Sequence, residues 1–250
     1  MTGLEGKNVL VTGASSGIGQ AIATRFGHER ANVAVNYVGA REGAEETEAK
    51  IREGYEGCVR QVRSCGVKVS LIKADVSQEE DVQRMVRTAV EELGGLDILI
   101  NNAGIQISGD SHEVEAAKFD KVLAINLRGA FLCAREAIRH WLEKGNQGVI
   151  INISSVHQII PKPHFLSYSV SKGGMQNLTR TLALEYAGRG IRINAVAPGA
   201  TVTPINRAWI DDPDKRAQVE RHIPQGRAGT SEEMAAVTAF LCSDEAAYIT

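Results

Sequence analysis

Short apolar runs recur along the chain and alternate with longer segments in which apolar residues return every three or four positions. Short runs rich in branched side chains are typical of buried strands, and the longer periodic segments are typical of amphipathic helices. This alternation predicts an α/β fold, a doubly wound parallel sheet (Rossmann-like) with crossover helices on both faces. The predicted strands cover residues 8–11, 33–35, 69–72, 98–100, 149–153 and 191–196.

The helices are indicated by apolar faces, most clearly over 18–26 and 82–93. The four-residue patterns that begin at Ser77 and Thr230 have the spacing of capping boxes, in which side chains satisfy the free N–H groups at the start of a helix. The segment 40–66 has a charged helical pattern that glycines interrupt, so it predicts either one helix or two.

Composition places the chain among ordinary globular proteins. Its 250 residues are 43% hydrophobic and 23% charged, which predicts one domain over 1–250. The formal net charge of −2 is spread along the sequence, which argues against a nucleic-acid or membrane partner. The four cysteines are widely spaced, so we expect reduced thiols, no metal site and a cytoplasmic location. Neither a leader peptide nor a membrane-spanning run is predicted.

A glycine-rich turn follows the first predicted strand, with the sequence TGASSGIG from Thr12 to Gly19. Such a turn between strand and helix lets the backbone approach a pyrophosphate, whose charge then lies at the positive end of the helix. A plain tight turn is the alternative interpretation. The position after an apolar N-terminal strand favours nucleotide binding.

Further segments follow this turn in a fixed order. They are NNAG from Asn101, then Asn126, Ser155, YSVSK from Tyr168 and PGATVT from Pro198. With this ordered set the chain resembles the short-chain dehydrogenases/reductases over nearly its whole length. Within that family, SSVHQIIPKPHFLSYSVSKGG, LALEYAGRGIRIN and TPIN are most similar to the glucose 1-dehydrogenases. The resemblance implies an oxidoreductase that transfers a hydride from the anomeric hydroxyl of glucose or a related sugar to NAD(P), giving the lactone.

Tyr168 and Lys172 are four residues apart, so on a helix their side chains share one face. A free phenol, with a pKa of about 10, is a poor base at neutral pH. An ammonium a few Å away favours the phenolate by about 3–4 kcal/mol at an effective dielectric of about 20, and so lowers the pKa of the phenol. Tyr168 is therefore a candidate general base for an alcohol proton.

The resemblance assigns two more catalytic roles. Ser155 would hold and polarise the reacting oxygen, and Asn126 would order a water molecule against Lys172. Taken singly, each residue has an ordinary structural alternative: a surface tyrosine, a serine at a strand end, or an asparagine packed through its amide. The complete set of four catalytic residues argues against a nucleotide-binding regulator without turnover.

The cofactor contacts are also carried over from the family. The glycine-rich turn would bind the phosphates, Asp75 and Val76 would bind the adenine edge, and Thr203 would meet the nicotinamide carboxamide. For Asp75, a helix-capping or solvated carboxylate is an alternative. The full predicted set is Gly13, Ser15, Gly17, Ile18, Gly19, Asn36, Arg41, Asp75, Val76, Asn102, Ala103, Gly104, Tyr168, Lys172, Pro198, Gly199, Val202 and Thr203.

The choice between NAD and NADP depends on the end of the second strand, where an acidic residue would bind the adenosine ribose and exclude a 2′-phosphate. We place Asn36 at that position, and Arg41 is the nearest cation. Since no carboxylate stands there to exclude NADP, we expect use of both cofactors, with NADP favoured.

Substrate contacts are predicted on segments around the nicotinamide end of the crevice. They would come from Gln106, His157, Lys162 and Asn206, together with Ser155 and Tyr168. For His157 a surface position is an equal alternative. The stretch 200–214 follows a strand's carboxyl end and is expected to form a lid.

The resemblance carries two further expectations. Family members continue beyond residue 250 with a glycine-containing final strand, so we expect that the chain shown stops before it. A homotetramer is expected through a helix pair over 119–142 and 168–186. Within the same family, the alternative activity is reduction of a 3-oxoacyl thioester on an acyl carrier.

Overall fold

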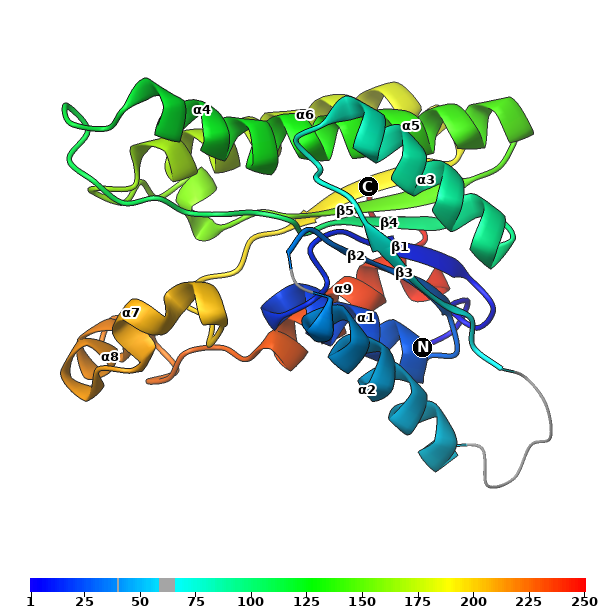
Figure 1. Ribbon diagram of the computed structural model, residues 1–250, viewed down its shortest axis with the longest axis horizontal. Helices are drawn as coiled ribbons and strands as arrows, with labels where there is room; N and C mark the ends of the chain where they lie inside the picture. Colours follow the sequence, from blue (N-terminus) through cyan, green and yellow to red (C-terminus); the bar gives the residue numbers. More distant parts are fainter. Residues whose placement is uncertain (40, 59–65) are drawn as a thin grey trace.

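The sheet lies in the middle of the molecule and contains six parallel strands in the order β3-β2-β1-β4-β5-β6 (Figure 1). The computed structural model describes residues 1–39, 41–58 and 66–250. The predicted fold class, a doubly wound parallel sheet, is confirmed. The strands are β1 (Asn8–Val11), β2 (Asn32–Tyr37), β3 (Val69–Lys73), β4 (Ile98–Asn101), β5 (Gly148–Ile153) and β6 (Ile191–Val196).

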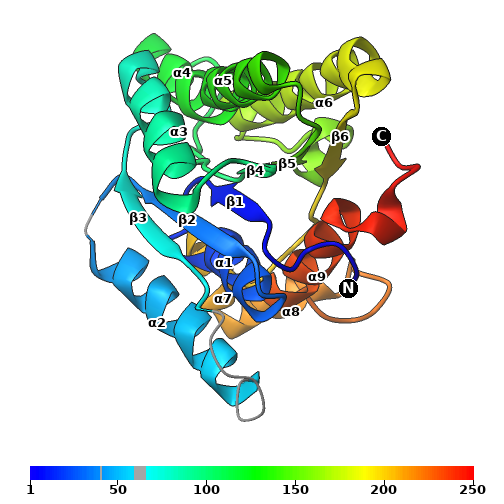
Figure 2. The ribbon, with the colours of Figure 1, turned by 90° about the vertical axis from the view of Figure 1, so that its right-hand side faces the viewer.

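Helices cover both faces of the sheet, as Figures 1 and 2 show. Helices α1, α2 and α9 lie on one face, and α3, α4, α5 and α6 lie on the other, while α7 and α8 follow β6. Their bounds are α1 (Gly17–His28), α2 (Glu42–Cys58), α3 (Glu79–Leu93), α4 (Ala116–Leu123), α5 (Gly129–Lys144), α6 (Leu166–Tyr186), α7 (Arg207–Ile210), α8 (Pro213–Glu220) and α9 (Ser231–Cys242).

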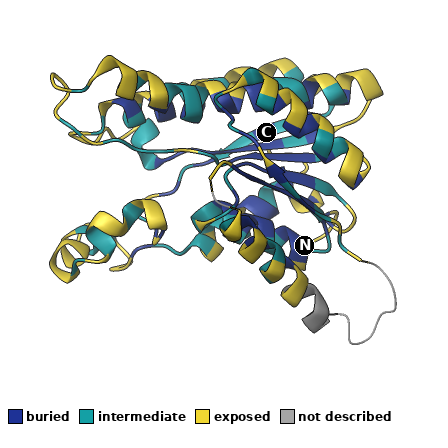
Figure 3. Ribbon diagram, in the orientation of Figure 1, coloured by how far each residue is buried: buried dark blue, intermediate teal, exposed yellow. Residues whose placement is uncertain are grey.

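The two layers of helices enclose two apolar cores. Because side chains alternate across a strand, Val9 and Val11 of β1 pack with α1 and α9, whereas Leu10 packs with α3 and α5. The strands are accordingly buried along most of their length, while the outer faces of the helices are exposed (Figure 3). Within the described ranges, no helix is both long enough and apolar enough to cross a membrane.

The helix starts agree only partly with the sequence predictions. Thr230 and Glu233 form the predicted capping box at the start of α9. The box predicted at Ser77 is wrong, because α3 begins at Glu79 and the Ser77 hydroxyl donates to the Asp75 carboxylate instead. In the segment 40–66 the described part contains one helix, α2, and the rest of that prediction lies outside the described residues.

The strand order determines where a ligand can bind. The chain builds β1, β2 and β3 in one direction and then returns to add β4, β5 and β6 on the other side of β1. In sheets of this kind a crevice opens at the carboxyl ends of the strands where the order reverses. Because all six strands are parallel, the loops that follow them emerge at this same edge.

Candidate active site

The glycine-rich turn after β1 has a backbone that phosphates can approach. Gly13 and Gly17 have φ angles of +61° and +56°, in the left-handed region that favours glycine. A Cβ on Gly13 would lie 2.9 Å from the Cα of Ala103. Ser16 caps α1 without a side-chain hydrogen bond, so no capping side chain covers the positive end of this helix. These features fit a pyrophosphate at the position predicted for Gly13, Ser15, Gly17, Ile18 and Gly19.

The loop after β4 holds this turn in place. The Asn102 amide donates to the carbonyls of Thr12 and Gly13, at 2.9 and 3.0 Å. In return, the Thr12 hydroxyl accepts the N–H groups of Asn102 and Ala103, at 3.0 and 3.1 Å. The predicted cofactor residues Asn102 and Ala103 therefore lie against the glycine-rich turn, and Gly104 follows them toward Asn126.

Asn36 bonds to the glycine-rich turn and to the segment after β3. Its side chain is buried, and its Oδ1 accepts the N–H of Gly13 at 3.0 Å while its Nδ2 donates to the carbonyl of Ala74 at 3.0 Å. Strand β2 continues to Tyr37. The amide is thus directed at neighbouring strand ends and positions Gly13, and a contact between Asn36 and the adenosine ribose stays a prediction.

The other residues predicted at the adenine end differ in the exposure and hydrogen bonding of their side chains. The Asp75 carboxylate accepts both the N–H and the hydroxyl of Ser77, at 2.9 and 2.7 Å, so it shapes its own loop. Val76 is buried beside it. Arg41 is 63% exposed and forms an ion pair with Glu45 at 2.9 Å, which places its charge at the surface near the start of α2.

The segment after β6 closes the opposite side of the crevice. Pro198 accepts the N–H of Val156 at 3.0 Å, which joins this segment to the loop after β5. Thr203 is buried, and a Cβ on Gly17 would lie 3.6 Å from its Cβ, so the start of the predicted lid lies close to the glycine-rich turn. Val202 is partly exposed, at 38%.

Three of the predicted catalytic residues lie together at the carboxyl end of β5. The Ser155 hydroxyl is a hydrogen-bond partner of the Tyr168 phenol. Both Tyr168 and Lys172 are on α6, and the Lys172 Nζ lies 5.7 Å from the centre of the Tyr168 ring. That Nζ donates to the carbonyl of Ile153 at 2.7 Å, which fixes the ammonium against the end of β5.

The pKa of Tyr168 differs in direction from the sequence prediction. Burial raises the pKa of Tyr168, and its hydrogen bond with Ser155 opposes that rise. The effect of leaving water therefore outweighs the expected lowering by Lys172. Burial also lowers the pKa of Lys172 to about 8. The ammonium is thus still mainly protonated at pH 7 and loses its charge as the pH rises past about 8.

Asn126 lies in a π-helical turn, Ala124–Arg128, that interrupts the predicted helix over 119–142. Its Oδ1 accepts the N–H of Ile105 at 2.8 Å, and its Nδ2 donates to the carbonyl of Ile105 at 2.9 Å and to the hydroxyl of Ser171 at 3.1 Å. Turns of this type are frequent at functional sites. Asn126 therefore joins the loop after β4 to α6, and the water link to Lys172 stays a prediction.

Two predicted substrate residues lie on the loop after β5. The His157 ring is 6.2 Å from the Tyr168 ring, in an edge-to-face arrangement, and its Nδ1 lies 2.8 Å from the carbonyl of Ile160. The Lys162 ammonium lies 4.0 Å from the centre of the Phe165 ring, and burial lowers its pKa. His157 is thus next to the catalytic phenol, and Lys162 is engaged within its own loop.

Of the other two predicted substrate residues, Gln106 joins two loops, whereas Asn206 bonds within its own loop. Gln106 donates through Nε2 to the carbonyl of Ile205 at 2.8 Å. Asn206 donates through Nδ2 to the carbonyl of Thr201 at 2.9 Å and also bonds to the Thr203 hydroxyl at 3.3 Å. Both amides therefore already have a protein partner for their donor group.

Sequence reasoning missed three groups that support the catalytic residues. They are the backbone of Ile105, the carbonyl of Ile153 and the hydroxyl of Ser171, which donates to the carbonyl of Tyr168 at 2.7 Å. A backbone group of an apolar residue leaves no signal in the sequence. Ser171 did carry one, because it lies three residues after Tyr168 on the same helix.

Known proteins of the short-chain dehydrogenase/reductase family are similar to this chain over nearly its whole length. A short-chain dehydrogenase/reductase family model, described as enoyl-(acyl carrier protein) reductase, matches residues 13–250. The glucose 1-dehydrogenase of Gluconobacter oxydans is 50% identical over 246 residues, which is 98% of this chain and 88% of that protein. The 3beta-hydroxysteroid dehydrogenase 1 of Eggerthella lenta is 47% identical, over 99% of this chain and 90% of that protein.

Two similar solved structures contain a nicotinamide cofactor. The 3-ketoacyl-(acyl-carrier-protein) reductase of Brucella melitensis, complexed with NADH, has a TM-score of 0.87 and is 34% identical, covering 99% of this chain and 95% of that one. A dehydrogenase of Agrobacterium tumefaciens with bound NADP also has a TM-score of 0.87 and is 33% identical, covering 98% and 92%.

Proposed function

Because the chain belongs to the short-chain dehydrogenase/reductase family, we propose that this NAD(P)-dependent oxidoreductase is a glucose 1-dehydrogenase. It would transfer a hydride from the anomeric hydroxyl of glucose, or of a related sugar, to the cofactor and give the lactone. The observation that carries the proposal is the position of the Ser155 hydroxyl and the Lys172 ammonium around the Tyr168 phenol. A relative that is 50% identical and named for this activity supports the choice of sugar.

The chemistry follows from these three side chains. When bound, the oxidised nicotinamide supplies the hydride acceptor and a positive charge. Tyr168 takes the alcohol proton, and Ser155 donates a hydrogen bond to the oxygen on which negative charge develops. Since burial raises the pKa of Tyr168, the ammonium of Lys172 is needed to favour the phenolate. Asn126 holds the loop after β4 against α6, which keeps the phenol in place.

For the cofactor, we propose that the protein uses both NAD and NADP and favours NADP. Support comes from the surface charge of Arg41 and from the absence of a carboxylate in the sequence Asn36, Tyr37, Val38 at the end of β2. The remaining predicted residues, from the glycine-rich turn to Thr203, would line the crevice around the dinucleotide. Fluorescence titration with NADH and NADPH gives the two affinities directly.

The assay that tests the substrate measures absorbance of the reduced nicotinamide. The purified protein is given glucose with each cofactor, and then other sugars, simple alcohols and, in the reverse direction, an acetoacetyl thioester. Oxidation of glucose that disappears in Tyr168→Phe is the expected result. Turnover of the thioester without any oxidation of a sugar would contradict the sugar proposal and favour the acyl-carrier reductase. Cofactor binding without turnover of any substrate would favour a regulator.

A specific observation favours a second substrate class, an alcohol on an apolar skeleton. Ile159, Ile160 and Ile205 are 70%, 63% and 46% exposed, on the two loops that also carry His157 and Asn206. The donor groups of Gln106 and Asn206 are already bonded to protein, so exposed apolar surface is a large part of what these loops offer. The relative named as a 3beta-hydroxysteroid dehydrogenase supports including a 3β-hydroxysteroid in the same assay.

We also propose a cytoplasmic homotetramer. A groove of about 430 Å³ lies on α4, the π-helical turn, α5 and α6. Phe131, which lines the groove, is 41% exposed, and Leu184, farther along α6, is 87% exposed. Cys133 and Cys242 are buried free thiols, which fits a reducing compartment. Light scattering of the purified protein measures the number of subunits, and a monomer at micromolar concentration would contradict the tetramer.

A further inference from the structure

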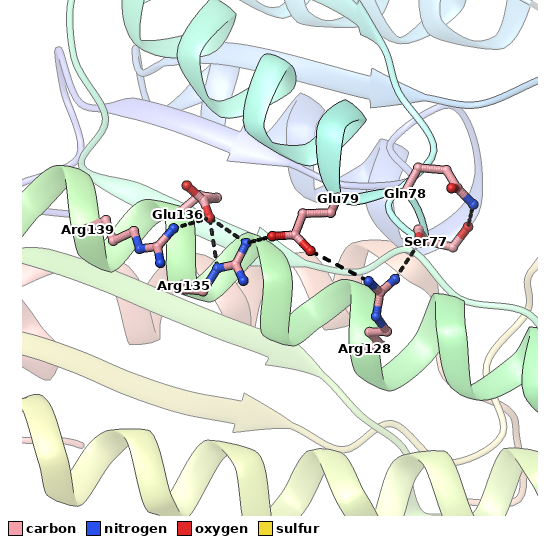
Figure 4. Close-up of polar contacts among 7 residues, drawn as sticks. All are labelled: Ser77, Gln78, Glu79, Arg128, Arg135, Glu136 and Arg139. Carbon is pink, nitrogen blue, oxygen red and sulfur yellow. Dashed lines mark hydrogen bonds and ion pairs between the residues drawn. The ribbon is translucent and has the colours of Figure 1, made fainter.

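The π-helical turn that carries Asn126 also contacts the adenine end of the crevice. Two residues after Asn126, the Arg128 guanidinium reaches the loop after β3, where its Nη1 donates to the carbonyl of Ser77 at 2.7 Å. Its Nη2 lies 3.7 Å from the Glu79 carboxylate at the start of α3. Figure 4 shows both contacts. Arg128 and Asn126 therefore bond in two different directions from one short turn.

A second contact between the same two segments is steric. Gly129 follows Arg128 directly and lies against Val76, so that a Cβ on Gly129 would be 2.9 Å from the Val76 Cγ2 and 3.0 Å from the Val76 carbonyl oxygen. The loop of Val76 is itself stiff, because Asp81 accepts the N–H of Asp75 at 2.8 Å. A shift of this loop would therefore be transmitted to the π-helical turn.

At its other side, the turn holds the nicotinamide end. Asn126 bonds to both backbone groups of Ile105, which follows Gly104 in the loop after β4, and it also bonds to Ser171, whose hydroxyl donates to the Tyr168 carbonyl. We infer that Arg128 is a positioning residue that couples the loop expected to bind adenine to the loop and helix that hold the catalytic phenol. This inference rests on the proposed cofactor site.

The charges around Arg128 provide a matched control. Glu79 is shared between Arg128 and Arg135, and Glu136 is shared between Arg135 and Arg139, as Figure 4 shows. The Arg128 and Glu79 side chains are 51% and 37% exposed, and pairs of this kind contribute little to stability. Arg139, 56% exposed, pairs with Glu136 at 3.1 Å at the far end of the network. Arg128→Ala and Arg139→Ala thus remove the same charge, and of the two only Arg128 touches the loop after β3. Because Arg128 also lines the groove of the proposed tetramer, light scattering must give the same number of subunits for both variants.

The test is hydrogen exchange of the full chain with ADP, which has the adenosine and both phosphates of the cofactor and lacks the second ribose and the nicotinamide. In the wild type, ADP should slow exchange in the adenine loop (residues 74–78) and also in 103–107 and 124–128. In Arg128→Ala, the protection of 103–107 should be lost, with ADP affinity and kcat each lowered about fivefold. Arg128→Lys, which keeps a cationic donor, should restore part of the effect, and Arg139→Ala should match the wild type.

Several outcomes would overturn the inference. One is protection in the wild type that stays within the glycine-rich turn and the adenine loop. Another is protection of 103–107 that persists in Arg128→Ala, or that Arg139→Ala also removes. Thermal unfolding of all variants identifies a general loss of stability, which would lower protection everywhere and would also count against a positioning role. If the wild type binds neither ADP nor a nicotinamide dinucleotide, the proposed function itself fails.

Discussion

The catalytic residues and the substrate loops lie side by side but are held by different kinds of contact. Ser155, Tyr168 and Lys172 are positioned by β5 and α6, and Asn126 connects them to a loop about twenty residues earlier in the chain. By contrast, His157 and Asn206 bond to backbone groups within five residues of themselves. The reacting centre is thus determined by the fold as a whole, whereas the substrate side at His157 and Asn206 depends on local loop conformation.

The largest effect on activity is expected at the reacting centre, from removal of the Tyr168 hydroxyl. In Tyr168→Phe the ring volume stays and the proton acceptor is lost, so kcat should fall by about 100- to 10,000-fold. Cofactor affinity should change less than about twofold, as measured by fluorescence titration of NADPH. A variant that keeps more than about a tenth of the wild-type kcat would show that the proton is taken by another group.

Lys172→Met should come next, with a loss that depends on pH. Burial raises the pKa of Tyr168, so without the ammonium the phenolate forms only at alkaline pH. We expect kcat to be lower by about 100-fold at pH 7 and by less as the pH approaches 10. A loss that is equal at all pH values would contradict the electrostatic role of Lys172.

The same variant should also change how stability depends on pH. The pKa of Lys172 is lowered from 10.5 to about 8 in the folded protein, so between these pH values the unfolded chain binds the extra proton. Wild-type stability from Lys172 should therefore rise with pH across that window, by about 3 kcal/mol at most. Urea unfolding at pH 7.5 and 10 measures this slope, which should be smaller in Lys172→Met.

The fold was predictable because every strand and most helices have a clear apolar pattern. The end of β2 shows where the pattern is insufficient. Its apolar run stops at Val35, yet the ladder with β3 continues through Asn36 opposite Ile72 and Tyr37 opposite Lys73. Because the side chains near this strand end are polar, the apolar pattern does not show the last ladder pairs, and it does not predict the hydrogen bond between Asn36 and Gly13.

For the site, the residue types were predictable but their partners were not. Helix spacing was enough to place Tyr168 and Lys172 on one face of α6. It could not show that the ammonium donates to the Ile153 carbonyl, or that burial dominates the pKa of the phenol. Both depend on how α6 packs against β5. A π-helical turn is likewise invisible in an apolar pattern, and it determines what Asn126 contacts.

Removal of the Arg41 charge at the adenine end should weaken binding of NADP moderately and leave binding of NAD unchanged. If Arg41 attracts the 2′-phosphate, Arg41→Ala should weaken NADP binding by about fivefold and leave NAD binding unchanged. Arg52→Ala is the matched control, because Arg52 forms the same kind of ion pair, with Glu48, on the same helix. If Arg41→Ala weakens the binding of NAD and NADP equally, Arg41 acts through the position of α2 and does not bind the 2′-phosphate.

The smallest effect on activity is expected in the substrate loops, at Asn206. Its Nδ2 donates to Thr201 and Thr203, so Asn206→Ala removes hydrogen bonds that order the start of the lid, and any contact with a sugar through Oδ1 is lost as well. We expect KM for the sugar to rise about three- to tenfold with little change in kcat, because a partly buried hydrogen bond contributes about 1 kcal/mol. Asn146→Ala, in the exposed turn after α5, is the control for loss of a surface amide.

A deoxy sugar distinguishes loss of a contact between Asn206 and the sugar from loss of order in the lid. If Asn206 contacts a hydroxyl, the variant should discriminate less than the wild type against the analogue that lacks it. If Asn206 only orders the lid, KM should rise by the same factor for both sugars, and the substrate side would then be determined by the conformation of its loops alone.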